Sequence, residues 1–209
     1  VKYIVTKLMK IAILVLAAGT SSRMQSMKQL EKINGTTLLN ISLEKAIQLQ
    51  KHDVYCILGA NATQIEKSIV NKKVTCINNE NYSQGLSTSI VTGLNYFIKK
   101  TLNYEAVFIL LADQPAIAID YLKSMVELHQ KNPKKIIASK YGNGYGVPAL
   151  FPKIYFNNLL EIQKDKGAKE FMENNKTKIV TSDLKTDFTD IDTVEDLNRF
   201  KKRNLNHYD

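Results

Sequence analysis

Apolar and polar positions alternate along the chain in a pattern that predicts strands and helices in turn. Residues 11–16 and 106–111 are continuous apolar runs, which is typical of strands buried on both faces of a parallel sheet. Leu86, Ile90 and Leu94 recur at the spacing of one helix face, so we expect an amphipathic helix there. The same reasoning predicts further strands at 53–58, 74–77, 136–139 and 178–181, further helices at 38–49, 64–70, 120–130, 153–162 and 168–174, and a loop over 140–146.

The last predicted helix has the clearest start signal in the chain. Thr193 is followed three residues later by Asp196, which resembles a capping box, and the acid also suits the positive end of a helix. Val194, Leu197 and Phe200 share one face of this helix and predict its buried stripe. We therefore expect a helix that begins just after Thr193 and packs against the rest of the fold.

The alternation of strands and helices indicates an α/β fold of the Rossmann-like, three-layer type, in which helices cover a mostly parallel central sheet. The sequence has no internal repeat, low-complexity stretch or Pro/Gly-rich linker, so we expect a single domain over residues 1–209. Residues 1–8 precede Met9 and the first strand, and we expect them to be a non-native or flexible extension. Ligands bind such sheets at the carboxyl ends of the strands, so the loops there are the candidate sites.

Composition narrows the functional classes. The chain is 44% hydrophobic and 23% charged, as globular proteins are, and no apolar run approaches the roughly 20 residues of a membrane span. Its net charge of +9 comes from dispersed basic residues without interleaved aromatic residues, so nucleic-acid binding is not expected. Cys56 and Cys76 each lie alone in an apolar run and predict reduced core residues. We expect a cytoplasmic protein whose basic charge attracts anionic substrates.

The loop after the first strand has the composition of a phosphate-binding loop. Residues 16–19, Leu-Ala-Ala-Gly, are followed by three hydroxyl residues, and the small side chains let the backbone approach a ligand and donate amide hydrogen bonds to phosphate. Arg23 and Lys28 add charge that matches a polyphosphate. The dinucleotide fingerprint and the Walker loop are both absent from this segment. A polar loop between strand and helix, with incidental basic residues, is the alternative.

Acidic residues follow the fourth predicted strand and precede the last helix. Asp113 ends a buried strand, where a carboxylate can bind a hard cation such as Mg²⁺ but can equally serve a turn or a helix cap. Asp190 and Asp192 come just before the last helix, and for Asp190 we expect a role in starting that helix. Gly85 and Ser89 open another helix in a way that suits a site for the base or ribose of a nucleotide.

Six sequence segments carry a resemblance to a known family. They are LAAGTSSRM with Lys28, then NYSQGLSTSI, LLADQP, GYGVPALF, DKGAKEFM and DIDTVEDL, and together they extend over nearly the whole chain. In this order the segments resemble the molybdenum cofactor cytidylyltransferase family, which belongs to the nucleotidyltransferases with a glycosyltransferase-A-like fold. Many nucleotidyltransferases share the first segment, whereas its combination with LADQP and the later G-V-P and D-K-G-A is more specific.

The resemblance implies a fold of the nucleotide-diphospho-sugar transferase type and an Mg²⁺-dependent enzyme. This enzyme would transfer CMP from CTP to molybdopterin carrying molybdenum, release pyrophosphate, and supply a recipient molybdenum hydroxylase. A glycine is common in guanylyltransferase relatives where Ala18 stands, which favours CTP. The residues assigned by resemblance are Leu16, Ala17, Ala18, Gly19, Gly85 and Ser89 for the nucleotide, Arg23 and Lys28 for its phosphates, and Asp113 with Asp192 for the metal.

Two positions depart from the family pattern. Gln25 stands where the family usually has glycine, and Met27 stands where it has proline. A positive φ at Gln25 would strain the phosphate loop by roughly 1 kcal/mol or more. Two alternatives therefore stay open. One is a nucleotidyltransferase for a sugar phosphate or another small phosphorylated acceptor, and the other is a non-catalytic carrier that hands molybdopterin cofactor to its recipient.

Overall fold

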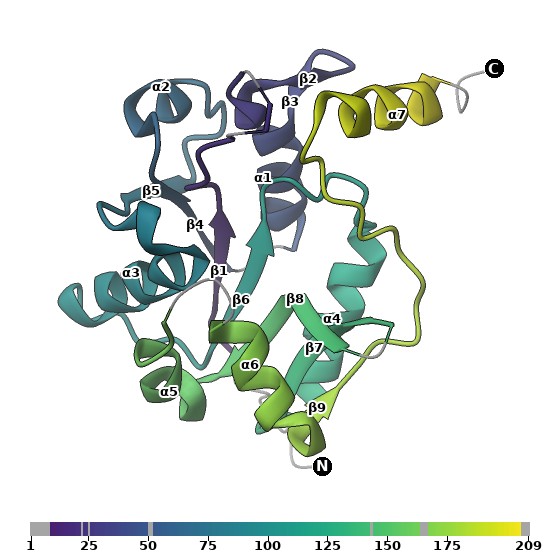
Figure 1. Cartoon of the computed structure of the whole chain (residues 1–209). Helices are drawn as coiled ribbons and strands as arrows, with labels where there is room; N and C mark the ends of the chain where they lie inside the picture. The colour runs from purple at the N-terminus through teal and green to yellow at the C-terminus, as the bar shows by residue number, and fades with distance from the viewer. Residues whose placement is uncertain are drawn as a thin grey trace, which may run out of the picture.

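The computed structural model describes residues 9–205 except residues 22, 25, 50–51, 143 and 164–166. Its centre is a seven-stranded sheet in the order β5-β4-β1-β6-β8-β7-β9 (Figure 1). Neighbouring strands pair in parallel except β8, which is antiparallel to both β6 and β7. The predicted α/β fold with a mostly parallel sheet is confirmed. The strands are β1 (Ile11–Leu16), β4 (Asp53–Leu58), β5 (Val74–Asn78), β6 (Ala106–Leu111), β7 (Ile136–Tyr141), β8 (Gly144–Pro152) and β9 (Ile179–Val180).

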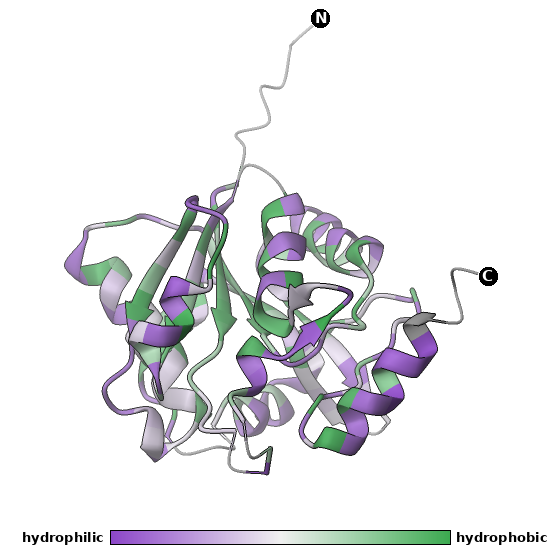
Figure 2. Ribbon diagram, turned by 90° about the horizontal axis from the view of Figure 1, so that it is seen from above, coloured by the Kyte–Doolittle hydropathy of each residue, from purple (hydrophilic) through white to green (hydrophobic). Residues whose placement is uncertain are grey.

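Helices cover both faces of this sheet (Figures 1 and 2). Alternate residues of β1 explain why: Ile13 packs in the core beneath one helical layer, and Leu14 packs in the core beneath the other. Because successive side chains of a strand point to opposite faces, a strand between two helical layers must be apolar at every position. One layer consists of α1 (Leu38–Gln48), α2 (Ala62–Lys67) and α4 (Ile119–Lys131), and the other of α3 (Leu86–Lys99), α5 (Phe156–Leu160) and α6 (Gly167–Asn174).

The main correction concerns residues 140–146, where the sequence predicted a loop. β7 continues to Tyr141 and β8 returns beside it from Gly144, so this segment is a β-hairpin. Glycine suggested a loop, yet a Cβ at Gly146 would lie 2.8 Å from the ring of Tyr141, so this glycine makes room for close packing. Glycine and proline have low strand propensity, so the local sequence indicated a loop. The hydrogen bonds between β7 and β8 stabilise the strands despite this composition, and they form only in the folded chain.

Smaller elements also differ from the predictions. The helix predicted over 153–162 divides into the 3-10 helix η3 (Lys153–Tyr155) and α5, and α2 begins and ends two to three residues earlier than predicted. A small hairpin of β2 (Lys32–Ile33) and β3 (Thr36–Thr37) was not predicted. Such short elements depend on tertiary partners more than on local pattern. The remaining 3-10 helices are η1 (Lys28–Leu30), η2 (Tyr82–Gln84) and η4 (Lys176–Lys178).

The last helix, α7 (Val194–Leu205), begins with the predicted capping box. The amide of Asp196 donates to Thr193 Oγ1 at 3.1 Å, and the amide of Thr193 donates to Asp196 Oδ2 at 3.0 Å. The predicted stripe needs one correction: Leu197 is buried and Phe200 packs against the same cluster, but Val194 is 46% exposed. Its position in the first turn directs Val194 toward solvent.

A separate apolar cluster fixes the segment before α7 against the beginning of the chain. Ile191 and Leu197 are buried together with Met24, Ile33 and Leu38. The amide of Ile191 also donates to the carbonyl oxygen of Asp113 at 2.9 Å. Burial of these apolar side chains therefore brings residues 190–192 next to the ends of β1 and β6, although they are distant in sequence.

Two expectations from composition can be compared with the structure. Cys56 is buried, Cys76 is partly buried, and both are free thiols, as predicted. Within the described ranges, no helix combines the length and apolar character needed to cross a bilayer.

Acid sensitivity of the fold is expected from His129, which lies in α4 and is 1% exposed. Among the described residues, neither of its ring nitrogens has a hydrogen-bond partner. Burial lowers the pKa of His129 to about 4; attraction to Glu105 opposes this shift and repulsion from His52 adds to it. Because the unfolded chain binds this proton near pH 6.5, stability falls as the pH drops from about 6.5 toward 4.

We expect His129 to reduce the free energy of unfolding by about 2 kcal/mol between pH 7.5 and pH 5. Urea unfolding at both pH values measures this loss. In His129→Leu, the difference between the two pH values should shrink by about that amount. An equal pH dependence in both proteins would contradict the prediction.

Candidate active site

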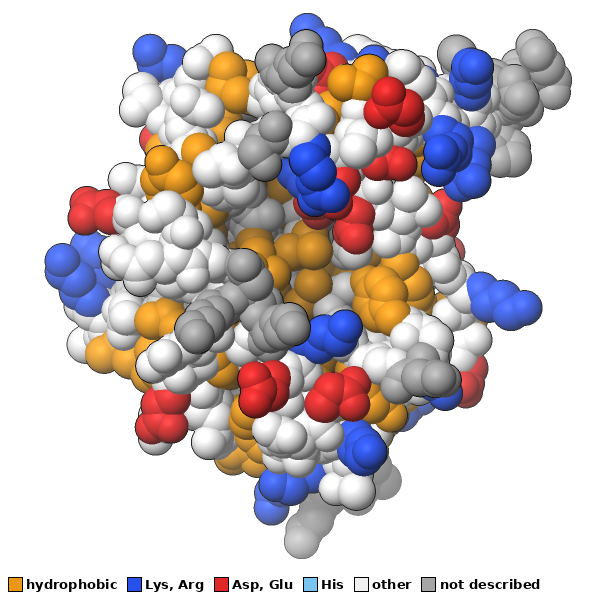
Figure 3. Space-filling model, viewed as in Figure 1, with side chains coloured by type: hydrophobic (Ala, Val, Ile, Leu, Met, Phe, Trp, Pro, Cys, Tyr) orange, Lys and Arg blue, Asp and Glu red, His pale blue; other side chains and the backbone are white. Residues whose placement is uncertain are grey.

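A cleft of about 410 Å³ opens at the carboxyl ends of β1 and β6, and Figure 3 looks into this hollow. Its walls come from the loop after β1, the segment before and within α3, the end of β6, and the segment before α7. Arg23 is not part of the wall but contacts Asp192 at its edge. The predicted site residues that line the cleft are Leu16, Ala17, Ala18, Gly19, Lys28, Gly85, Ser89, Asp113 and Asp192.

The first loop, defined here as residues 17–21, directs its carbonyl groups toward the protein. Gln29 Nε2 donates to the carbonyl oxygens of Ala17 at 3.1 Å and Gly19 at 2.8 Å. The carbonyl oxygen of Ala18 accepts from the amide of Ala60 at 3.4 Å. In a trans peptide the next amide points away from the carbonyl, so the amides of residues 18–20 are directed away from these partners. Backbone amides that do not point toward a partner in the protein can donate to an anion.

Gln29 is a candidate that sequence reasoning missed. Its side chain is 3% exposed and accepts a hydrogen bond from Ser21 Oγ at 3.1 Å, while Ser21 Oγ accepts one from the amide of Lys28 at 3.1 Å. Ser21 has a φ of 56°, a left-handed conformation that is unfavourable for serine and is held by these bonds. The only sequence signal was an amide residue next to Lys28. Gln25, where we expected strain, lies outside the described residues.

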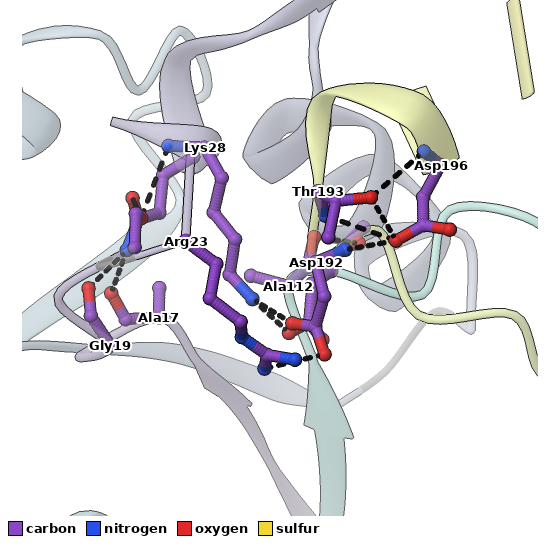
Figure 4. A network of polar contacts seen from close by, with 12 residues as sticks. Ala17, Gly19, Arg23, Lys28, Ala112, Asp192, Thr193 and Asp196 are labelled. Atoms are coloured by element: carbon purple, nitrogen blue, oxygen red, sulfur yellow. Dashed lines mark hydrogen bonds and ion pairs between the residues drawn. The ribbon is translucent and has the colours of Figure 1, made fainter. Parts of the chain in front are cut away.

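A group of charged side chains meets at the cleft, and Figure 4 shows Arg23 and Lys28 pointing toward Asp192. Lys28 Nζ lies 2.6 Å from Asp113 Oδ2 and 3.0 Å from Asp192 Oδ1. Arg23 Nη2 lies 2.8 Å from Asp192 Oδ2. The structure thus brings together the two cations predicted to bind phosphate and the two acids predicted to bind metal, and pairs them with each other.

These contacts keep both kinds of group ionised. Burial alone would lower the pKa of Lys28, but attraction to Asp113 and hydrogen bonds to both carboxylates raise it above its usual value. Burial alone would raise the pKa of Asp192, but the hydrogen bond and charge of Lys28, together with the charge of Arg23, lower it. Lys28 and Asp192 therefore face each other as opposite charges at neutral pH.

The Asp113–Asp192 pair fits a divalent cation. One oxygen of each carboxylate contacts Lys28 Nζ, and the other oxygen of Asp113 is buried and has no hydrogen-bond partner in the part of the chain that the structure describes. Mg²⁺ is usually held by one or two carboxylates together with substrate phosphates. No group of three or more His, Cys, Asp or Glu residues in the described ranges could hold a metal ion. A cation at this pair would therefore depend on oxygens supplied by a ligand.

Asp190 requires a correction. We expected it to serve the start of α7, but Thr193 and Asp196 make that cap, and Asp190 lines the cleft instead. Its side chain keeps an exposed face, yet partial burial and repulsion from Asp113 raise its pKa to about 6. Asp190 is thus a third carboxylate near Asp113 and Asp192. The capping pattern in the sequence had indicated a different role for this residue.

Another part of the cleft wall comes from residues 82–89. Ser89 is buried, and its Oγ accepts a hydrogen bond from Asn79 Nδ2 at 3.0 Å, so it belongs to the wall of the cleft. Gly85 precedes α3 with a φ of 112°, a conformation that glycine adopts without strain. The predicted nucleotide residues therefore line one cavity.

Gly59 and Tyr82 were also missed by the sequence analysis. A Cβ at Gly59 would lie 2.6 Å from the Cβ of Tyr82 and 2.7 Å from the carbonyl oxygen of Ala18. Glycine at this position is needed because residue 59 lies close to both Ala18 in the first loop and Tyr82 in η2. A glycine directly after a buried strand was the available signal.

Comparison with known proteins gives a consistent assignment. The sequence matches the family described as the MobA-like NTP transferase domain over residues 13–179. The bifunctional protein GlmU of Legionella pneumophila subsp. pneumophila is 28% identical over 174 residues, which cover 80% of this chain and 37% of GlmU. The chain thus spans little more than a third of that curated relative.

Two solved structures show the same fold at low sequence identity. Rv0371c from Mycobacterium tuberculosis, in complex with manganese, is 21% identical with a TM-score of 0.71, covering 93% of this chain and 98% of that chain. A CMP:2-keto-3-deoxy-manno-octonic acid synthetase complexed with CTP is 13% identical with a TM-score of 0.75, covering 95% of this chain and 99% of that chain.

Proposed function

The chain belongs to the MobA-like NTP transferase domain family, and from this premise we propose that it transfers CMP from CTP to molybdopterin carrying molybdenum. Membership makes it a nucleotidyltransferase. The choice of CTP, the acceptor, the use of Mg²⁺ and the delivery of product to a molybdenum hydroxylase are the proposed parts.

The arrangement around Lys28 is the observation that carries the proposal. Asp113 and Asp192 present oxygens to one point beside Lys28 and Arg23, next to the amide-lined first loop. A triphosphate with a divalent cation matches this set, because its phosphates complement the two basic groups and the amides while the cation complements the acids.

The proposed reaction is an in-line displacement at the α-phosphorus of CTP. A phosphate oxygen of the acceptor forms the new bond, the bond to the β-phosphate breaks, and pyrophosphate leaves with its electron pair. The amides of the first loop position the phosphates, and Lys28 and Arg23 stabilise the charge on pyrophosphate once they turn from the acids to the phosphates. A divalent cation held by Asp113 and Asp192 would neutralise phosphate charge. The acceptor phosphate is already anionic, so no side chain has to act as a base.

A sugar-phosphate acceptor is the second candidate. The GlmU relatives and the CTP-bound synthetase of a sugar acid favour it. The later segments, GYGVPALF and DKGAKEFM, favour the molybdopterin acceptor instead, through the resemblance that they carry. The two candidates share the nucleotide half of the cleft and differ in the acceptor half.

The test is incubation of the chain with Mg²⁺, each of CTP, GTP, ATP and UTP, and either molybdopterin cofactor or a set of sugar phosphates. We expect pyrophosphate and the cytidine dinucleotide of molybdopterin from CTP alone. Product with a sugar phosphate would replace the proposed acceptor. Tight binding of molybdopterin cofactor without pyrophosphate release under any condition would indicate a carrier.

Base choice is expected to depend on Ala18. Ala18 lines the cleft and its methyl group lies beside Gly59, where we place the base. One methyl group in a pocket wall changes the discrimination between two substrates by about 1–3 kcal/mol. At the lower end of this range, Ala18→Gly should reduce the preference for CTP over GTP by about tenfold. The ratio of kcat/KM for the two nucleotides at matched Mg²⁺ measures this. An unchanged ratio would assign base choice to residues 82–89.

A further inference from the structure

Lys28 fills the point at which two carboxylates of the cleft converge. Its Nζ is within hydrogen-bond distance of Asp113 and Asp192, and its side chain is only 14% exposed. Mg²⁺ binds carboxylate oxygens at about 2.1 Å, so a cation bridging these oxygens would need the space that the ammonium group fills. Lys28 and a metal ion therefore exclude each other at this point.

The local charges also disfavour a free metal ion. Lys28 and Arg23 balance the charges of Asp113 and Asp192. A metal ion that displaced Lys28 would leave an ammonium group without these two partners in a largely buried position, and such unpaired charge is costly. The two carboxylates therefore attract a free cation less strongly than unpaired carboxylates would, because they already form ion pairs with Lys28 and Arg23.

A nucleoside triphosphate changes this balance. Its phosphates would offer Lys28 and Arg23 new partners beside the first loop, and a metal ion carried on those phosphates would bring its own charge compensation. The backbone of Lys28 is held by the hydrogen bond from its amide to Ser21 Oγ, so the flexible side chain can turn without moving the loop. The exchange keeps the charges of Lys28, Arg23, Asp113 and Asp192 paired.

From this geometry we infer that Lys28 is a specificity-determining residue that makes the cleft select the metal–nucleotide complex over the free metal ion. Lys28 serves as the counter-cation of Asp113 and Asp192 until a nucleotide arrives, and then pairs with its phosphates. The inference rests on the proposed function, because it takes Asp113 and Asp192 as the metal ligands. It adds an order of binding, in which the metal enters with the nucleotide.

The test measures binding of Mn²⁺ alone to the full chain by electron paramagnetic resonance, without nucleotide. We expect weak binding by the wild type and binding tighter by about tenfold or more in Lys28→Met, whose unbranched side chain lacks the charged end group of lysine. Lys99→Met removes the same charge from the exposed end of α3 and should bind Mn²⁺ like the wild type. A non-hydrolysable CTP analogue should restore tight Mn²⁺ binding to the wild type.

The outcomes separate this inference from the proposed function. Equal Mn²⁺ affinity in the wild type and Lys28→Met would overturn the role of Lys28, even if the wild type turns over CTP. A gain that persists in Lys28→Met combined with Asp113→Asn would also overturn it, because the metal would then lie elsewhere. Lack of turnover with every acceptor would count against the proposed function alone. Circular dichroism verifies the fold of each variant, and Lys28→Gln replaces Lys28→Met if the latter does not fold.

Discussion

Replacing Asp113 by asparagine is expected to lower the metal-dependent rate of nucleotidyl transfer by about a thousandfold while the protein stays folded. Asparagine has the shape of aspartate but not its charge, so the cation would lose an anionic ligand at the reacting phosphates. Loss of such a ligand commonly raises the activation free energy by several kcal/mol. The fold should survive, because the carbonyl oxygen of Asp113 still accepts from Ile191 and Lys28 still contacts Asp192.

The measurement is kcat/KM for CTP at saturating acceptor over a series of Mg²⁺ and Mn²⁺ concentrations. Asp120→Asn is the matched control, because it makes the same change at an exposed side chain in the first turn of α4. Asp120→Asn should retain wild-type kinetics. Turnover of Asp113→Asn within about tenfold of the wild type would remove Asp113 from the metal site.

Replacing Gln29 by leucine is expected to lower kcat/KM for the nucleotide by about a hundredfold. Leucine has a similar volume but cannot donate to the carbonyl oxygens of Ala17 and Gly19, and each buried polar group left without a partner costs about 1–3 kcal/mol. The first loop can then turn these carbonyls toward the cleft, where they would repel phosphate. Ser21 would lose its acceptor as well, and its left-handed backbone would lose support.

Two measurements separate this positioning role from a general loss of stability. Urea unfolding should show that Gln29→Leu loses about 2–3 kcal/mol, and titration calorimetry should show weaker binding of a CTP analogue. Leu159→Ala, in the buried face of α5, should lose similar stability with an unchanged affinity for nucleotide. Weak nucleotide binding in both variants would mean that stability alone is responsible, and intact binding in Gln29→Leu would exclude the role.

The strands and helices around β1 could be predicted from the sequence because they satisfy a local rule. β1 and β6 are apolar at every position since both faces are covered, and Ile90 and Leu94 lie on the buried face of α3 as their spacing predicted. Leu86, predicted on the same face, is instead 39% exposed in the first turn of α3. The β7–β8 hairpin did not follow such a rule. Its glycines resemble those of a loop, and its strand character comes from pairing with β6 and β7.

The candidate site divides in the same way. The first loop and Asp113 were identified because each directly follows a buried strand, and parallel strands bring their carboxyl ends to one edge. Gln29, Gly59, Tyr82 and the cleft position of Asp190 could not be identified, because their roles depend on hydrogen bonds and close contacts with distant residues.

The sequence by itself determined the α/β fold, the loop after β1 and the chemical types gathered there, because hydrophobic periodicity and strand-end loops are local properties of the chain. Only the tertiary structure decided which of these groups contact each other. Burial of Ile191 and Leu197 with Met24 places Asp192 beside Lys28, across most of the chain length. The sequence predicted that the acids would bind a metal ion and that the basic residues would bind phosphates. In the structure these groups contact each other instead, because opposite charges in a partly buried cleft form ion pairs.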